Sequence, residues 1–275
     1  MRLVDSHCHL QVDRFADDRD AVIERAHGEG VERILVPGWN TWSSEAALAL
    51  STRTTWLDAA VGVHPHDAAK VPAAEWAAIE SWATDARVVA IGETGLDYDR
   101  VFSPIADQLD NLRRNLALAL ATGKPAILHC RSAPGTRDAQ DALLAELKAA
   151  GFGDDARLTS FGGRPPAVIH SFSGPVDYAR DMLDLGVAIS FSGLVFRQGE
   201  ESSAEVVTLV PGDRLMVETD SPYLSPPGAP RGRNEPGWVR VTAGWVADRR
   251  RTTPEALGDG LVAAYDGVFH RPGRS

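Results

Sequence analysis

Six of the eight histidines in this 275-residue chain stand at the downstream ends of short apolar runs. They are His7, His9, His64, His66, His129 and His170. Such runs predict strands, and in a parallel barrel the carboxyl ends of the strands form the face that carries active sites. A neutral imidazole is a common metal ligand, so several imidazoles on one face indicate metal-dependent chemistry. A structural role explains one such histidine easily and explains six poorly.

The segment Asp5-Ser-His7-Cys-His9 places two histidines two residues apart. In extended backbone, residues i and i+2 point to the same side, so His7 and His9 can both reach one divalent ion. Cys8 points the other way, and we interpret it as a small buried residue rather than a ligand.

Two carboxylates end nearly pure apolar runs, Glu93 in VVAIGE and Asp220 in LMVETD. A buried carboxylate must be hydrogen-bonded, paired or bound to metal, because burying an isolated charge is costly. Glu218 lies on the same face as Asp220 by strand alternation, so the pattern does not show which of these two carboxylates is the ligand. Four imidazoles and two carboxylates are enough for two adjacent divalent cations bridged by Glu93. The predicted metal ligands are His7, His9, Glu93, His129, His170 and Asp220.

Eight strand–helix units are needed to position these residues, and the sequence supplies them. The strand candidates are Arg2–Asp5, Arg33–Pro37, Leu57–Val63, Arg87–Gly92, Pro125–His129, Ala167–Ser171, Val187–Phe191 and Arg214–Glu218. Glycines end three predicted helices, at Gly30, Gly123 and Gly151. Eight units in about 250 residues predict a TIM-type (β/α)8 barrel, here one domain over residues 1–275, with a doubly wound sheet as the alternative. Residues 131–166 and 221–237 are irregular segments predicted to contain long loops, the first in its Gly/Pro/Ser-rich stretch 151–166.

The composition narrows the possible partners. A net charge of −10 argues against a broad basic surface for nucleic acid, although it leaves room for a small phosphate site. No apolar run approaches the length of a membrane span, and no signal peptide is evident. Two cysteines fit a reducing compartment, so we expect a cytoplasmic protein without a membrane partner. Nothing indicates an obligate protein partner.

The motifs together resemble one known family. DSHCHL, GVHPH, GETGLDY, HCR, HSFSG, ETDSPYLSP and RGRNEP occur in that order from residue 5 to residue 236. This pattern is similar to that of the TatD family of metal-dependent deoxyribonucleases. The resemblance implies a barrel with one metal held by His7, His9 and Asp220, a second by His129 and His170, and Glu93 shared between them. Ser171 departs from the pattern, since a cysteine is common there.

Further roles are expected around this ligand set. Asp220 is expected to be the catalytic base, with Glu93 also catalytic through the metals. His64 and Arg131 are expected to contact a substrate phosphate, and Asp97 to orient a ligand histidine from outside the set. Arg231 and Arg233 could contact a nucleic-acid backbone or simply keep a proline-rich loop solvated.

Three functions compete at this point. The first is hydrolysis of phosphodiester bonds in DNA, with exonuclease-like action on single-stranded or frayed ends and two cations that could be Mg²⁺, Mn²⁺ or Zn²⁺. The alternative is a binuclear barrel hydrolase that acts on a carboxyl ester, amide or lactone, including aminoacyl-tRNA. Many such enzymes bridge their metals with a carbamylated lysine, whereas Lys124 precedes its strand here. The third is a non-catalytic scaffold. It is disfavoured because buried carboxylates and imidazoles without a function would lower the stability of the fold.

Overall fold

The eight predicted strands form a single parallel sheet in sequential order in the computed structural model, which describes residues 1–230 and 232–270. They are β1 (Leu3–Asp5), β2 (Val31–Pro37), β3 (Leu57–Val61), β4 (Val88–Asp97), β5 (Ala126–Arg131), β6 (Ala167–Ile169), β7 (Ala188–Phe191) and β8 (Leu215–Val217). Backbone hydrogen bonds close the barrel, because they join the residues that follow β1 to β8 and to the residues that follow β8. Ser6 N donates to Val217 O (3.1 Å), and His9 N donates to Ser221 O (2.8 Å). The predicted (β/α)8 barrel is confirmed, and the doubly wound alternative is wrong.

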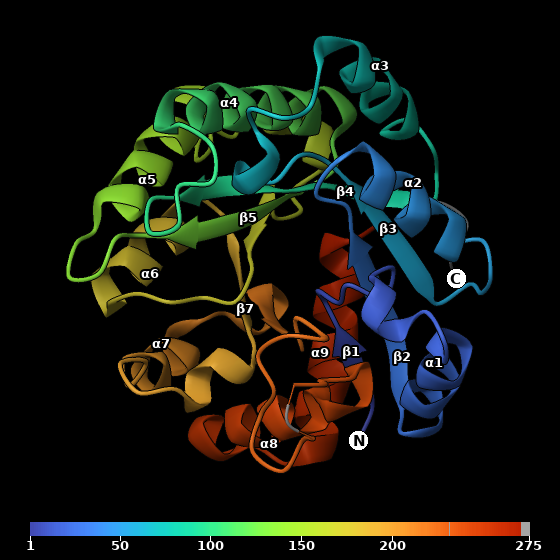
Figure 1. Ribbon diagram of the computed structural model, residues 1–275. Coiled ribbons are helices and arrows are strands. Elements are labelled where there is room, and N and C mark those ends of the chain that lie inside the picture. The colour runs from blue at the N-terminus through green and yellow to red at the C-terminus, as the bar shows by residue number, and fades with distance from the viewer. Residues whose placement is uncertain (231, 271–275) are drawn as a thin grey trace.

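Helices surround the strands in chain order (Figure 1). They are α1 (Arg19–Gly28), α2 (Thr41–Leu50), α3 (Ala73–Trp82), α4 (Ile105–Thr122), α5 (Asp138–Ala150), α6 (Val176–Asp184), α7 (Ser203–Leu209), α8 (Val239–Arg250) and α9 (Pro254–Val268). The glycines after α4 and α5, Gly123 (φ 63°) and Gly151 (φ 96°), adopt the left-handed conformation that ends a helix, as predicted. Helix α9 packs against β1 and β8, and its Gly258 lies against the backbone of Arg2, at the end of the barrel opposite the histidines.

The longest strand, β4, continues five residues beyond its predicted end at Gly92 and is buried throughout. Its register with β5 shifts between Ile91 and Thr94, so the strand carries Glu93 inside a bulge rather than at its tip. At Gly95 (φ 136°) a side chain would overlap the carbonyl oxygen of His129. This close approach requires glycine, and it brings the GETGLD segment alongside the histidine of β5.

The two predicted loops contain short 3₁₀ helices. Thr159–Phe161 lies in the first loop, where Phe161 is buried, and Pro236–Trp238 ends the second. No helix in the described part of the chain is both long enough and apolar enough to cross a membrane.

Candidate metal centre

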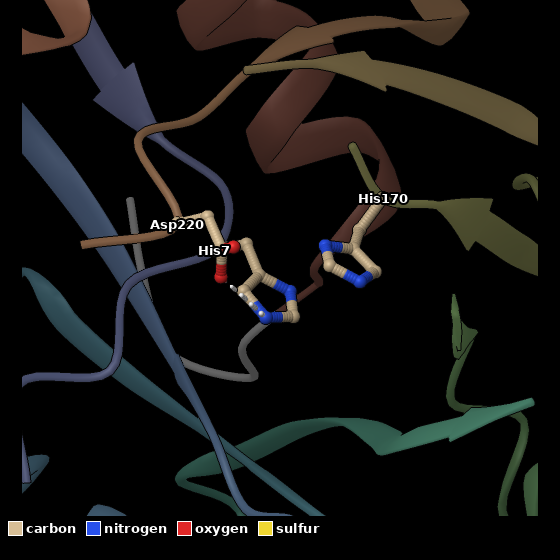
Figure 2. A group of neighbouring side chains, drawn as sticks. All are labelled: His7, His170 and Asp220. Atoms are coloured by element: carbon tan, nitrogen blue, oxygen red, sulfur yellow. Dashed lines mark ion pairs between the residues drawn. The ribbon is translucent and has the colours of Figure 1, made fainter. Parts of the chain in front are cut away.

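Side chains from distant parts of the sequence converge at the carboxyl ends of the strands. Figure 2 shows His7, His170 and Asp220 approaching one another, with the dashed line marking the 3.8 Å separation of His7 Nε2 and Asp220 Oδ1. The rings of His7 and His170 are stacked, with centroids 3.9 Å apart. Residues that are more than 200 positions apart in sequence thus share one site.

One set of atoms surrounds a point between β1, β4 and β8. His7 Nε2 lies 3.2 Å from His9 Nε2 and 3.2 Å from Glu93 Oε2. Asp220 Oδ1 lies 3.2 Å from His9 Nε2. Two imidazole nitrogens and two carboxylate oxygens therefore face one another within contact distance.

A second set surrounds the other oxygen of Glu93. Glu93 Oε1 lies 2.9 Å from His170 Nε2 and 3.3 Å from His129 Nδ1, and these two nitrogens are 3.4 Å apart. The carboxylate of Glu93 thus stands between two groups of imidazoles, one at each of its oxygens.

The electrostatics of this centre fit bound cations. Glu93 is almost fully buried, and burial raises its pKa, but the surrounding histidines, His170 foremost, hold that pKa well below its usual range. Within the described residues, the ion pairs of Glu93 and Asp220 are all with histidines and none is with lysine or arginine. The buried carboxylate of Glu93 and the half-buried one of Asp220, both facing imidazole nitrogens, form a donor set suited to divalent metal.

A carboxylate lies behind each histidine of the second set, in a hydrogen bond at His170 and at ion-pair distance at His129. His170 Nδ1 lies 3.2 Å from Glu218 Oε1, and His129 Nε2 lies 3.4 Å from Asp97 Oδ2. Although burial lowers the pKa of His170, the charge of Glu93 and the hydrogen bond to Glu218 raise it well above its usual value. His170 is therefore a charged partner of Glu93, and a neutral ring with its proton on Nδ1 toward Glu218 would offer Nε2 to a metal. Asp97 lies beside His129, and its Oδ2 accepts a 2.6 Å hydrogen bond from His66 Nε2.

The structure separates Glu218 from Asp220, which strand alternation had left equivalent. Strand β8 ends at Val217, and Asp220 takes a left-handed conformation (φ 53°) that turns its carboxylate toward His7 and His9. Glu218 is fully buried behind His170 and accepts bonds from the backbone N (2.7 Å) and Oγ (2.9 Å) of Ser171. Although burial raises the pKa of Glu218, the bond and charge of His170 lower it to about 2.

Glu218→Gln should lower metal affinity about 10- to 100-fold, because a histidine loses its orienting carboxylate. Isothermal titration calorimetry with the metal measures this affinity. Glu205→Gln, on the exposed side of α7, is the matched control. Unchanged affinity in both variants would show that Glu218 does not orient His170.

His64 is placed inside the centre rather than at its edge. Its Nε2 lies 3.3 Å from Glu93 Oε1, while its Nδ1 accepts a hydrogen bond from the backbone N of His66 (3.0 Å). Burial lowers the pKa of His64 to about 4, so the ring is neutral near pH 7 and its proton sits on Nε2. With its proton on Nε2 the ring donates hydrogen bonds, and His64 also forms, with Glu93 and His129, a group that could hold a metal ion.

Asp5 also supports the site, a role that the sequence motifs did not indicate. It is fully buried, and its Oδ1 accepts hydrogen bonds from the backbone N of Thr219 (2.9 Å) and of His7 (3.3 Å). It therefore ties the segment that carries His7 to the segment that carries Asp220. A charged residue inside the apolar run Leu3–Asp5 was the available signal.

The centre lies in a cleft of about 1260 Å³. Arg131 lines this cleft, but its Nε donates to Asp99 Oδ2 at 2.6 Å, so its side chain forms an ion pair at the rim. Arg233 binds Asp18 through Nη2 (2.5 Å) and does not line the cleft. Arg231 lies outside the described residues.

Comparison with known proteins identifies similar chains over nearly the full length. A family model described as "TatD related DNase" matches residues 4–270. The "3'-5' ssDNA/RNA exonuclease TatD" of Erwinia billingiae is 36% identical over 279 residues, covering 98% of this chain and 100% of that protein. The "Uncharacterized metal-dependent hydrolase YabD" of Bacillus subtilis is 34% identical, covering 93% and 94%. Among solved structures, the TatD homologue YJJV of Escherichia coli superposes with a TM-score of 0.85 at 27% identity, covering 98% and 99%.

Proposed function

Because this chain belongs to the TatD-related DNase family, we propose that it is a metal-dependent hydrolase that cleaves phosphodiester bonds in DNA. The observation that carries this proposal is Glu93, whose two carboxylate oxygens face two separate imidazole groups at the base of an open cleft. This arrangement suits a pair of cations, which phosphodiesterases use to neutralise a reacting phosphate.

We propose that one cation is held by His7, His9 and Asp220, the other by His129 and His170, with Glu93 bridging. When bound, such cations polarise the phosphoryl oxygens and lower the pKa of the attacking water. Oxygen and imidazole ligands are compatible with Mg²⁺, Mn²⁺ or Zn²⁺.

The remaining roles belong to side chains of the chain itself. The carboxylate of Asp220 reaches the cleft, so it is our proposed acceptor of the proton from the attacking water. We propose that His64 Nε2, which lies 3.3 Å from Glu93 Oε1, donates a hydrogen bond to a phosphate oxygen when substrate binds. Arg131, at the rim, would make a second phosphate contact only if its ion pair with Asp99 loosened.

Single-stranded or frayed ends are the proposed substrates. With a net charge of −10, the protein has no long-range attraction for DNA, so binding must depend on a few contacts inside the cleft. A cleft admits a chain end more readily than the middle of a duplex. The carboxyl-ester alternative has weaker support, because Lys124 Nζ donates to the carbonyls of Ala83 and Asp85 and is absent from the metal centre.

We also propose that the protein works in the cytoplasm. Its two cysteines, Cys8 and Cys130, are both free, as expected in a reducing compartment.

Chelated protein should be inactive and should regain nuclease activity with one or more of Mg²⁺, Mn²⁺ and Zn²⁺. End-labelled single-stranded DNA should be shortened stepwise, with a shallow salt dependence because few phosphates are contacted. The Asp220→Asn protein, purified in parallel, controls for contaminating nucleases. Efficient nicking of closed circular duplex with a steep salt dependence would contradict the proposal.

A further inference from the structure

We propose that Arg100 and Phe102 form a nucleotide clamp at the mouth of the cleft. The clamp would bind the nucleotide next to the bond that is cleaved, with Arg100 on its phosphate and Phe102 stacked on its base. This inference rests on the proposed function and names the part of the substrate that the cleft recognises.

Arg100 is distinguished by its lack of a partner. The basic side chains that line the cleft are Lys70, Arg100, Arg131 and Arg137. Three of them form ion pairs, Lys70 with Asp67 (2.9 Å), Arg131 with Asp99 (2.6 Å) and Arg137 with Asp177 (2.6 Å). The Arg100 guanidinium makes no hydrogen bond or ion pair with any described residue. It can therefore accept a phosphate without giving up an existing contact.

Phe102 is the most exposed large apolar side chain of the described residues, at 62%. It lines the cleft, and its ring meets that of His66 edge-on, with centroids 4.7 Å apart. The ring of His66 lies 4.3 Å from that of His64, whose Nε2 contacts Glu93. The rings of His66 and His64 thus lie between the exposed Phe102 ring and Glu93. This separation suits a nucleotide next to the one that reacts. Stacking a base on it would remove apolar surface from water.

The backbone holds this segment in place at both ends. Asp97, which contacts two histidines of the site, accepts hydrogen bonds through Oδ1 from the backbone N of Asp99 (3.1 Å) and Arg100 (2.8 Å). At the other end, the buried Ser103 donates through Oγ to His66 O (3.0 Å). Arg100 and Phe102 therefore project from a short loop that is anchored to the metal centre.

Val101 lies between them in a left-handed conformation (φ 45°) while 44% of its surface is exposed. A β-branched residue rarely adopts this conformation, and such outliers concentrate at functional sites. On either side of this turn, Arg100 and Phe102 are both exposed and both line the cleft.

A single strand is the occupant that these features favour. The face of a base must be free to stack on Phe102, which the interior of a duplex does not allow. Stacking tolerates every base, so the clamp should give little sequence preference.

Kinetics on two single-stranded oligonucleotides test the clamp, one intact and one with abasic units at both ends. Phe102→Ala should raise KM for the intact oligonucleotide by about 5- to 100-fold, with little change for the abasic one. Arg100→Ala should raise KM for both by about tenfold or more, and should reduce the salt slope of binding by about 0.7. Phe102→Trp should restore most of the binding.

Two matched controls lie outside the cleft. Trp42 is also an exposed aromatic side chain (54%), and Arg180 is an exposed arginine on α6. Trp42→Ala and Arg180→Ala should leave both substrates unaffected, and metal content and thermal unfolding should be equal in all variants.

Wild-type kinetics in both Arg100→Ala and Phe102→Ala would overturn the clamp while leaving the nuclease proposal intact. An equal loss of binding by Phe102→Ala on intact and abasic substrates would exclude base stacking and overturn it as well. Wild-type protein that cleaves no nucleic acid under any metal would overturn the proposed function, and the clamp with it.

Discussion

Asp220→Asn is expected to reduce DNA hydrolysis by at least 10²- to 10⁴-fold while leaving the fold intact. The substitution removes the carboxylate that faces His9 Nε2 at 3.2 Å and that we propose accepts the proton from water. Asparagine tolerates the left-handed conformation at this position (φ 53°), and the backbone bond from residue 220 N to His7 O (2.9 Å) remains. The measurements are kcat at saturating metal and the thermal unfolding midpoint.

Asp213→Asn is the matched control for this variant. Asp213 is exposed and precedes β8, at the opposite end of the strand that leads to Asp220. The Asp213→Asn variant should retain full activity. Hydrolysis by Asp220→Asn at a rate near that of the wild type would show that Asp220 is neither the base nor an essential ligand.

Glu93→Gln is expected to lower bound metal from two ions per chain to at most one and to reduce activity by more than 10²-fold. The two oxygens of Glu93 face separate imidazole groups, at 3.2 Å from His7 Nε2 and 2.9 Å from His170 Nε2. A glutamine offers one neutral oxygen and one NH₂ group, so it cannot present an oxygen to both groups. Loss of an outer contact alone costs 10- to 100-fold, and loss of a bridging ligand should exceed that.

Elemental analysis of Mn²⁺-loaded protein measures the stoichiometry. Glu200→Gln is the control, because Glu200 also lines the cleft but bonds Ser173 Oγ (2.8 Å) and no histidine. If the wild type binds one ion per chain and Glu93→Gln binds the same number, Glu93 does not bridge two metals.

The barrel and the grouping of candidate ligands followed from the sequence because both depend on local patterns. Apolar runs and helix-ending glycines predicted the sequential strand order that the structure confirms, and the family predicted from the motifs is confirmed as well. In such a barrel the carboxyl ends of all strands share one face, so a residue at a strand end is placed without knowledge of its neighbours. The metal roles of His7, His9, Glu93, His129, His170 and Asp220 stay predictions.

Side-chain partners could be decided only by the tertiary structure. Alternation left Glu218 and Asp220 equivalent, and a left-handed residue beyond β8 separates them. The proton position on His64 depends on a backbone N two residues away in a 3₁₀ turn. Arg131 is paired and Arg100 is unpaired because Asp99, on the loop after β4, lies beside the end of β5. Each outcome depends on a turn or on contacts between elements, which strand and helix periodicity does not encode.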